Sequence, residues 1–456
     1  MVWSSSRSFP RAILHIDGDS FFASCEVAKD PRLRGKPVIT GKERGIVSAC
    51  TYEAKRLGVK RGMRLFEVRR LIPDAVILPS DYETYSIFSA RMYEIVRRYT
   101  PSVEEYSIDE CFADLGGMRR VHKMSYVQIA EAIKKDLERE LGMTFSIGVS
   151  ATKVLAKIGS KWKKPAGLTV IPLSDAPQFL KQTPVGSVWG IGPNTTNFLR
   201  QYGVRTAQEF AERSDAWVRA HLSKPFHAIW HELRGELVYE LEEGRETYQS
   251  ISKTKTFTPP SRDAHFVFSQ LSKNVESACI KARRWKLASS HIFFFLKTQD
   301  FKYHGCELRL SHATDVPHDI LGALKEHFPG IFSVGGGPSS GGRAPLYRAT
   351  GITLLKLQSV DSLQLDLFGR ALETADARDV FGRVDEIARR FGKHTVFLAS
   401  SLQARRFGAP ASTRQGAPRR GGHLGERGDT PERMKVAFKG ETARKRLAIP
   451  SLGEVG

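Results

Sequence analysis

Two adjacent acidic residues inside an apolar stretch constrain the fold of this chain more than any other feature. Asp109 and Glu110 interrupt residues 106–115, YSIDECFADL, and have apolar and aromatic neighbours on both sides. Such flanks are typical of two short strands. A charge buried in a half-covered strand pair costs free energy unless something neutralises it. A divalent metal is a suitable partner, because it takes oxygen ligands from more than one segment.

A second apolar segment that ends in acid lies near the N-terminus. Residues 13–22, ILHIDGDSFF, predict a strand that leads into Asp17 and Asp19. Together, Asp17, Asp109 and Glu110 predict a site for two magnesium ions. Taken alone, an Asp-Glu pair in a turn is most often a solvated surface feature, and Asp-x-Asp after a strand is common in loops.

A large excess of positive charge indicates a polyanionic partner. The 456 residues carry a formal net charge of +21, and the pI is about 9.8. Nucleic acid is the simplest such partner, since its phosphates bind Lys and Arg with release of counterions. The alternative is a basic protein without such a partner. The length is sufficient for about two to four domains.

The cysteine pattern indicates neither a zinc site nor a disulfide framework. There are five cysteines, an odd number, and no CxxC pair occurs. This usage fits a reducing cytosol. The first residues lack the apolar core of a signal peptide, and no run reaches the length of a membrane span. We therefore expect a cytoplasmic protein with no membrane partner.

Strands and helices interleave through about residue 171. The acids lie between strands without a long crossover, so an antiparallel, ferredoxin-like α+β sheet is favoured over a doubly wound parallel sheet. The apolar patterns predict strands at 11–17, 37–40, 144–149 and 168–171, and helices at 20–29, 64–71, 82–99, 125–141 and 151–162. Residues 46–58 are predicted to be a strand that runs into a short helix ending at Gly58.

Residues 186–250 are predicted to be helical and contain a glycine-rich hairpin, VWGIGP, at 188–193. Gly190 and Gly192 would offer backbone N–H groups to a phosphate, and a helix through Phe198 would follow. In a basic protein this order favours a helix–hairpin–helix that grips a DNA backbone. A Gly-x-Gly alone is weak, since any tight turn uses one.

Residues 251–358 predict a second small α+β domain of βαββαβ order. Its last helix and last strand are separated by a glycine-rich insert at 334–342. After about residue 402, Gly, Pro and Arg dominate, and residues 401–456 hold 12 Lys and Arg against 5 Asp and Glu. This composition predicts a largely disordered basic tail, which could simply be a solubilising end.

With these pieces in order, the chain resembles the Y-family of translesion DNA polymerases, most closely the bacterial DNA polymerase IV (DinB) group, over roughly residues 11–368. The resemblance implies an α+β right-hand polymerase. Its expected parts are a ferredoxin-like palm at 11–185 with small fingers inserted at about 31–87, a helical thumb with the helix–hairpin–helix at 186–250, a little finger at 251–368 and a C-terminal extension at 369–456. The segments that carry it are 17–22 (DGDSFF), 51–55 (TYEAK), 106–110 (YSIDE), 150–157 (SATKVLAK) and 163–167 (KKPAG).

The resemblance also implies the chemistry of the acidic cluster. Nucleotidyl transfer requires an activated primer 3′-hydroxyl and a stabilised pyrophosphate leaving group, and two metal ions can do both. By resemblance, Asp17 and Asp109 bridge both Mg²⁺ ions, Glu110 holds the ion nearer the primer, and the Gly18 carbonyl contacts the other. Asp19 is not a ligand in the family, so we expect a structural or hydrogen-bonding role for it. The implied activity is low-fidelity translesion synthesis by a DNA-directed DNA polymerase.

Nucleotide contacts are implied for four residues. Tyr52, Lys55 and Lys164 fall where the family places contacts to the triphosphate. Lys55 is usually Arg in relatives, so a point charge replaces a bidentate fork. Phe22 matches the steric gate that excludes a ribose 2′-hydroxyl. By itself, Lys164 would be taken as a solvated surface lysine and Phe22 as a core residue.

The resemblance further implies a primed DNA template, deoxynucleoside triphosphates and the bacterial sliding clamp as partners of a monomeric enzyme. The expected clamp-binding peptide is QLDLF at 364–368, whose Leu and Phe anchors suit a hydrophobic pocket. An ordinary amphipathic linker is the alternative. The implied DNA and clamp contacts are Gly190, Gly192, Lys253 and Lys255 for DNA, and Gln364, Leu365, Leu367 and Phe368 for the clamp.

Two other classes of function remain open from the residues alone. One is a catalytically weak, clamp-binding mutasome scaffold with a polymerase fold, which missing carboxylates would favour, although all three are present. The other is a different palm-type enzyme such as a nucleotide cyclase. A cyclase would need neither the hairpin nor the clamp motif nor the basic second α+β domain.

Overall fold

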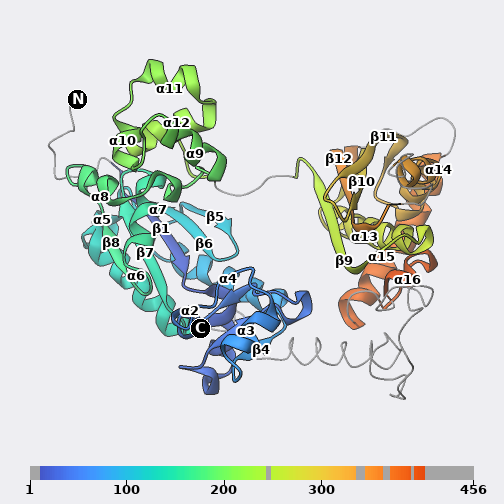
Figure 1. Cartoon of the computed structure of the whole chain (residues 1–456), viewed down its shortest axis with the longest axis horizontal. Helices are drawn as coiled ribbons and strands as arrows, with labels where there is room; N and C mark the ends of the chain where they lie inside the picture. Colours follow the sequence, from blue (N-terminus) through green and yellow to red (C-terminus); the bar gives the residue numbers. More distant parts are fainter. Residues whose placement is uncertain (1–10, 243–247, 335–344, 363–369, 392–394, 406–456) are drawn as a thin grey trace. The chain divides into compact units, whose positions relative to one another are not determined.

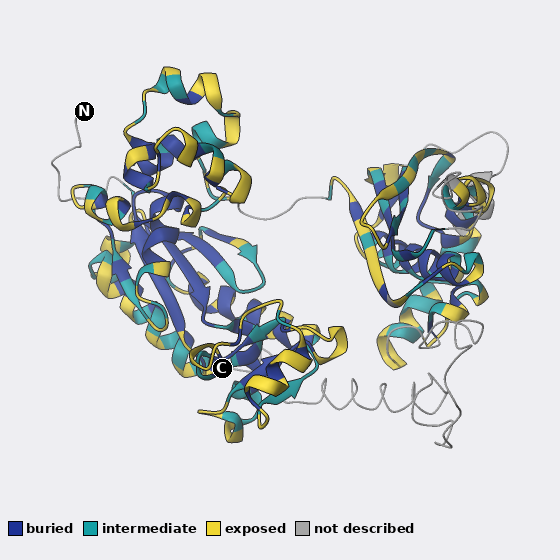
Figure 2. Cartoon of the chain, viewed as in Figure 1, coloured by how far each residue is buried: buried dark blue, intermediate teal, exposed yellow. Residues whose placement is uncertain are grey.

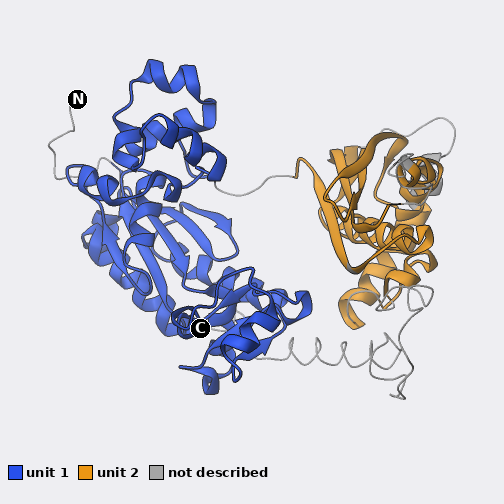
Figure 3. Cartoon of the chain, in the orientation of Figure 1, with its two compact units in different colours: residues 1–245, 447–456 blue, residues 246–446 orange. Residues whose placement is uncertain are grey.

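The structure is a computed structural model that describes residues 11–242, 248–334, 345–362, 370–391 and 395–405. The chain forms two compact units, which divide between residues 245 and 246 (Figure 3). The expected clamp-binding residues 364–368 and, from residue 406 onward, the basic tail expected from about residue 402 lie outside the described residues. Within the described ranges, no helix combines the length and the apolar character needed to cross a membrane.

The first unit is built on a five-stranded sheet of order β5-β6-β1-β7-β8 (Figure 1). All neighbours are antiparallel except β7 and β8, which are parallel. The expected antiparallel α+β sheet is therefore confirmed, and the doubly wound alternative is excluded. The strands are β1 (Ile13–Gly18), β5 (Val103–Ser107), β6 (Glu110–Asp114), β7 (Phe145–Ser150) and β8 (Leu168–Val170).

Helices cover both faces of this sheet, and the alternation of β1 decides which residues each face receives. Leu14 and Ile16 join a large apolar core with the helices α1, α4 and α6, while Ile13 packs with Phe112 and with Ala156 of α7 on the other face. Figure 2 shows the sheet as the buried centre of this unit. The helices are α1 (Phe21–Lys29), α4 (Tyr82–Arg97), α5 (Met118–His122), α6 (Tyr126–Leu141) and α7 (Lys153–Trp162).

Gly148 allows α7 to lie directly on the sheet. A Cβ atom at this position would stand 1.9 Å from the Ala156 carbonyl oxygen and 2.4 Å from the Ser160 nitrogen. Gly159 on the helix approaches the same point, where its own Cβ would lie 3.1 Å from the Gly148 Cα. This close crossing brings the side chains of α7 onto the sheet face that carries the odd-numbered residues of β1.

A small second sheet and its helices are inserted between α1 and α4. The strands have the order β3-β2-β4 and enclose a core of their own around Ile39, Val47 and Val68. The strand β4 was not expected from the sequence; its three residues are all half-buried and carry no alternation. The elements are η1 (Pro31–Leu33), β2 (Val38–Thr40), η2 (Lys42–Arg44), β3 (Ala49–Cys50), α2 (Tyr52–Arg56), α3 (Leu65–Leu71) and β4 (Val76–Leu78).

The helical part of the first unit contains the expected glycine hairpin. Gly190 adopts φ +85°, and a Cβ there would stand 2.6 Å from Ile229 Cδ1, so a side chain at this position would be strained and would also clash. Gly192 caps the helix that follows through Phe198, as expected. The elements are α8 (Ala176–Gln182), η3 (Val185–Ser187), α9 (Pro193–Gln201), α10 (Ala207–Ala211), α11 (Asp215–His221) and α12 (Lys224–Leu233).

A buried carboxylate fastens this helical part to the sheet layer. Glu232 at the end of α12 is fully buried and accepts hydrogen bonds from the backbone N–H groups of Val154 (3.2 Å), Val238 (2.8 Å) and Tyr239 (2.9 Å). Thr152 Oγ1 donates to the Glu232 carbonyl at 2.9 Å. Three donors to one carboxylate satisfy a charge that would otherwise be costly to bury.

The second unit has the predicted βαββαβ order around a four-stranded antiparallel sheet, β11-β10-β12-β9. The helices α13 and α14 contribute Leu271, Val275 and Leu324 to its core. The elements are β9 (Ile251–Ser261), α13 (Ala264–Arg284), β10 (Leu287–Thr298), β11 (Tyr303–Thr314), α14 (Pro317–Val334), β12 (Tyr347–Ser359) and η5 (Val360–Ser362).

Three further elements that the sequence did not suggest belong to the second unit: α15 (Arg370–Phe391), η6 (Ala399–Ser401) and α16 (Leu402–Arg405). Polar contacts attach them to α13. Arg283 pairs with Asp385 at 2.8 Å. The buried Glu276 pairs with the buried Arg405 at 2.5 Å and accepts from Leu398 N, also at 2.5 Å. Because these elements are attached through ion pairs, their sequences show little apolar periodicity from which a helix could be predicted.

Candidate active site

The pairing of β1 with β6 brings the predicted acids together. In this register Asp17 lies opposite Glu110, and Gly18 N donates to the Asp109 carbonyl at 2.9 Å. Asp109 occupies the turn between β5 and β6, where Ser107 Oγ donates to its Oδ1 at 2.7 Å. Three carboxylates from two segments, 92 residues apart, thus meet at one end of the sheet.

Two lysines from the chain that follows β7 neutralise this cluster. Lys164 contacts Asp17, and Lys157 of α7 contacts Glu110. Burial raises the pKa of Asp17 to about 6, although Lys164 acts in the opposite direction. Burial also raises the pKa of Glu110, but contacts with His15 and with the Lys157 ammonium outweigh it and hold this pKa well below its usual range.

His15 completes the wall of the cluster under α7. It is fully buried, its Nδ1 lies 2.7 Å from Ser160 Oγ, and its Nε2 lies 3.6 Å from Glu110 Oε2. Burial lowers the pKa of His15 to about 4, so the imidazole is neutral at neutral pH. A neutral ring adds no positive charge to the site.

The donors of this cluster fit a hard divalent cation. All three are carboxylates, and oxygen is the ligand type that Mg²⁺ takes. Lys157 and Lys164 show that Glu110 and Asp17 already require positive charge in this environment. The lysines and a metal would compete for the same oxygens, so an ion here would free both ammonium groups for other contacts.

Asp19 has the hydrogen-bonding role expected for it. It is 1% exposed; its Oδ1 accepts from Ser146 Oγ at 2.8 Å and its Oδ2 from Ala166 N at 2.7 Å. These bonds tie the end of β1 to β7 and to the loop that carries Lys164. Asp19 therefore stabilises the frame of the site.

Gly18 ends β1 beside a tightly packed ring. A Cβ at this position would lie 2.7 Å from Phe21 Cδ2 and 3.4 Å from Met143 Cε. A larger residue here would have to displace the Phe21 ring, which belongs to the core. The next aromatic residue, Phe22, has a different environment.

Phe22 is half-buried at the first turn of α1 and lies flat on another ring. Its centroid is 4.6 Å from that of Tyr85, with an interplanar angle of 12°, and Tyr82 packs edge-on at 5.3 Å. Tyr85 is fully buried and its hydroxyl donates to Glu26 at 2.8 Å. The ring of Phe22 is thus held in one place from two sides.

Helix α2 of the inserted part contributes a cation and a phenol near the acids. Lys55 Nζ lies 4.0 Å from the centre of the Tyr52 ring and donates to Ser20 Oγ at 2.8 Å. Burial and the nearby charges of Asp19 and Asp17 raise the pKa of Tyr52 to about 12. The structure thus brings Tyr52, Lys55 and Lys164 to the same acidic site.

Lys157 and Trp189 are two residues at this site to which the sequence assigned no role. The Lys157 ammonium lies 4.5 Å from the Tyr106 ring centre and 5.5 Å from that of Trp189. Trp189 Nε1 donates to Tyr106 Oη at 2.9 Å, so the residue before Gly190 touches the YSIDE segment. The signal in the sequence that could have identified Lys157 as a site residue was a charged side chain on the buried face of a helix.

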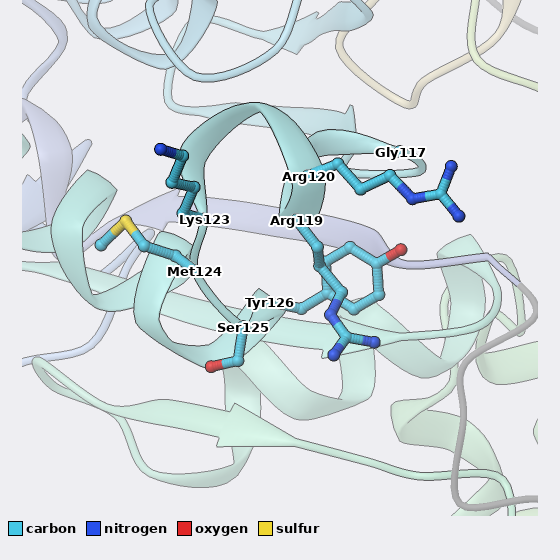
Figure 4. A pocket seen from close by; sticks show the side chains of 7 residues that line it. All are labelled: Gly117, Arg119, Arg120, Lys123, Met124, Ser125 and Tyr126. Atoms are coloured by element: carbon cyan, nitrogen blue, oxygen red, sulfur yellow. The ribbon is translucent and has the colours of Figure 1, made fainter.

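The residues predicted to contact DNA belong to other elements than the acids do. Gly190 and Gly192 form the hairpin before α9, and Lys253 and Lys255 lie on β9, at the edge of the sheet of the second unit. A separate hollow of about 700 Å³ over α5 and the start of α6 contains none of the predicted residues (Figure 4). Its lining is Gly117, Arg119, Arg120, Lys123, Met124, Ser125 and Tyr126.

Comparison with known proteins identifies relatives along most of the chain. The model of the impB/mucB/samB family matches residues 16–161, and that of the family's C-terminal domain matches residues 248–367. A DNA polymerase IV from Caulobacter vibrioides is 30% identical over 402 residues, covering 86% of this chain and 95% of the relative. A DNA polymerase IV from Moorella thermoacetica is 32% identical over 410 residues, covering 86% and 96%.

Solved structures share the fold. The "Y-family DNA polymerase chimera Dbh-Dpo4(243-245)-Dbh" aligns with a TM-score of 0.65 and 21% sequence identity, covering 76% of this chain and 99% of the chimera. The "Insertion ternary complex of Dbh DNA polymerase" aligns with a TM-score of 0.52, also at 21% identity. At this level of identity the likeness establishes the fold, which is the α+β class predicted from the sequence.

Proposed function

Because this chain belongs to the Y-family of DNA polymerases, as a DinB-like member of the DNA polymerase IV group, we propose that Asp17, Asp109 and Glu110 form its nucleotidyl-transfer centre. The protein is a DNA-directed DNA polymerase of the low-fidelity, translesion class. Enzymes of this family require a divalent metal. The substrates of the protein are a primed DNA template and deoxynucleoside triphosphates.

The observation that carries the proposal is the register of β1 against β6. It places Asp17 opposite Glu110 and beside Asp109, so that the three side chains offer only oxygen atoms as ligands. When bound, two Mg²⁺ ions would activate the primer hydroxyl and neutralise the charge that develops on the pyrophosphate. Asp17 and Asp109 would hold both ions, Glu110 the one nearer the primer, and the Gly18 carbonyl the other.

The residues around the acids would bind and orient the nucleotide. Lys164, released from Asp17, would bind the triphosphate together with Lys55 and the hydroxyl of Tyr52. Lys55 lies close enough to bind the triphosphate, because its ammonium group already donates a hydrogen bond from α2 to Ser20 at the start of α1. The ring of Phe22, held by Tyr85, would lie under the sugar as a steric gate.

Primer extension tests this assignment of function. With Mg²⁺ and deoxynucleotides, the full chain should extend a primer annealed to a longer template strand. A scaffold with a polymerase fold would give no extension while still binding the sliding clamp. The two outcomes separate the leading proposal from the alternative, which the three intact carboxylates do not favour.

DNA binding and clamp binding complete the proposal. The backbone N–H groups around Gly190 and Gly192 would hold a phosphate of the duplex, and Lys253 and Lys255 would contact the backbone from the second unit. The peptide QLDLF at 364–368 would bind the bacterial sliding clamp through its Leu and Phe side chains. The enzyme would act as a monomer in the cytoplasm.

Replacing Leu367 and Phe368 together by alanine should weaken clamp binding at least about tenfold, because buried apolar anchors dominate small interfaces. Surface plasmon resonance with an immobilised bacterial sliding clamp measures the affinity. Primer extension without the clamp should not change. The matched control is Leu363→Ala, one residue before the motif; equal affinities for all three proteins would exclude this peptide as the binding site.

A further inference from the structure

We propose that Asp215, His227 and His231 form a second metal site, specific for a divalent transition-metal ion such as Zn²⁺ and separate from the polymerase centre. Each of the three side chains offers one ligand atom, and these atoms all lie within 4.8 Å of one another. They belong to α11 and α12, two neighbouring helices of the helical part of the first unit (Figure 1). None of them takes part in the chemistry described above.

The helix α12 places two imidazoles side by side. His227 and His231 are four residues apart, and residues at this spacing are neighbours on a helix surface. Their ring centroids are 4.4 Å apart. The His227 ring also lies parallel to that of Trp230, with centroids at 5.7 Å and an interplanar angle of 14°. Packing on the buried Trp230 limits the ring orientations of His227 before any ion binds.

The first residue of α11 supplies the third ligand. Asp215 Oδ1 lies 2.6 Å from His227 Nε2, and its Oδ2 lies 2.8 Å from Arg219 Nε. The arginine therefore holds one carboxylate oxygen and leaves the other directed at the imidazole. Ligands of a tetrahedral zinc ion are roughly 3.3 Å apart, given metal–ligand distances of about 2.0–2.1 Å. Asp215 is exposed, so it can move by the small amount that insertion of an ion requires.

A carboxylate behind the second histidine resembles the outer shell of a metal site. Glu236 Oε2 lies 2.5 Å from His231 Nδ1, and Arg234 holds the other oxygen of Glu236 at 3.3 Å. This contact occupies Nδ1 and leaves Nε2 as the ligand atom. A histidine that binds a metal commonly donates its other N–H to a carboxylate, which fixes the ring and increases the basicity of the ligand nitrogen.

The donor set separates this site from the polymerase centre. Two imidazoles with one carboxylate suit Zn²⁺ and its neighbours in the first transition row, whereas three carboxylates suit Mg²⁺. Three protein ligands leave a fourth position for water or another molecule. A bound ion would join the start of α11 to α12, which are held together in its absence by the His227–Asp215 contact.

The test uses the full chain, stripped of metal and then held in excess Mg²⁺ so that the acidic centre is saturated. Zn²⁺ is titrated against a chromogenic chelator, and Co²⁺ is followed by its visible absorption, which reports tetrahedral nitrogen and oxygen ligands. We expect one ion per chain. The transition temperature of the unit that contains α12 should rise with Zn²⁺ concentration, because a ligand that binds the native state stabilises it.

Variants distinguish this site from adventitious binding to the 13 histidines of the chain. The double variant His227→Gln, His231→Gln should lose the stoichiometric ion, and Glu236→Gln should bind it about 10–100-fold more weakly while retaining all three ligands. The matched control is His265→Gln, His327→Gln, which removes two exposed histidines elsewhere and should bind like wild type.

Circular dichroism of the metal-free variants controls for folding. A wild-type chain that binds no Zn²⁺ in excess Mg²⁺ would overturn the proposal. So would unchanged stoichiometry and affinity in the folded His227→Gln, His231→Gln variant. Should that variant fail to fold, the folded Glu236→Gln variant decides the question: an unchanged affinity would contradict the role of Glu236 and, with it, the proposed geometry.

Discussion

Replacing Asp109 by alanine is expected to reduce nucleotide incorporation at least about 10³-fold while binding of primed DNA persists. The residue lies in the turn between β5 and β6 and is proposed to hold both ions. Metal ions at such a centre contribute several kcal/mol of transition-state stabilisation, and each 1.36 kcal/mol is a factor of ten in rate. Single-turnover primer extension measures the loss, and fluorescence anisotropy with labelled primer–template measures the affinity for DNA.

The same hairpin offers a matched control for this variant. Glu105 lies on β5, is exposed and pairs with Arg97 at 2.7 Å. Glu105→Ala should therefore extend primers at nearly the wild-type rate, because exposed ion pairs contribute little. Rapid synthesis by a folded Asp109→Ala protein would refute the metal-site assignment. A collapse of both variants would indicate that the hairpin, and not the carboxylate, limits activity.

The acidic centre could be predicted from the sequence because its signals are local. The strands around Asp17 and Glu110 are short, apolar and interrupted by charge, and burial of such charge predicts a shared partner. The structure pairs these two residues directly. The predicted hydrogen-bonding role of Asp19 was also confirmed, in its bonds to Ser146 and Ala166.

The surroundings of the acids could not be predicted in the same way. Lys157 reaches Glu110 only because α7 crosses the sheet at Gly148, where no side chain intervenes. His15 looked like one more strand residue, and only the arrangement of β1, β6 and α7 shows that it lies buried beside Glu110. Contacts of this kind depend on where two distant elements meet, which periodicity does not encode.

Elements without apolar periodicity were the ones missed in the fold. The helix α15 attaches to the second unit through Arg378–Asp315 and Arg283–Asp385, and none of the described residues on it is fully buried. The one-turn helix α5 is too short for a repeat to be visible. In contrast, the βαββαβ order of the second unit was predicted from apolar strand segments that interleave with helical ones, and it was confirmed.

The structure gives a physical reason why Phe22, and not its neighbour Phe21, would control sugar selectivity. Its neighbour Phe21 is 3% exposed and belongs to the core, whereas Phe22 is half-buried and stacked on Tyr85. If Phe22 is the steric gate proposed above, contacts with Tyr85 on one side and Tyr82 on another would leave its ring little room to move away from a 2′-hydroxyl. A fixed ring would reject a ribonucleotide by steric clash, so the selectivity would depend on how firmly Phe22 is held.

Phe22→Ala should therefore increase the ratio of ribonucleotide to deoxynucleotide incorporation by about 10²-fold, which corresponds to roughly 2.7 kcal/mol of lost discrimination. The measurement is kcat/KM for a single incorporation of each nucleotide opposite the same template base. Phe22→Tyr retains the ring and should keep the selectivity, while Tyr82→Ala removes the edge contact but leaves the Phe22–Tyr85 stack and should give a smaller increase. If the ratio for Phe22→Ala equals that of wild type while deoxynucleotide incorporation continues, another side chain excludes the 2′-hydroxyl. The rigid stack would then serve only to pack α1 against α4.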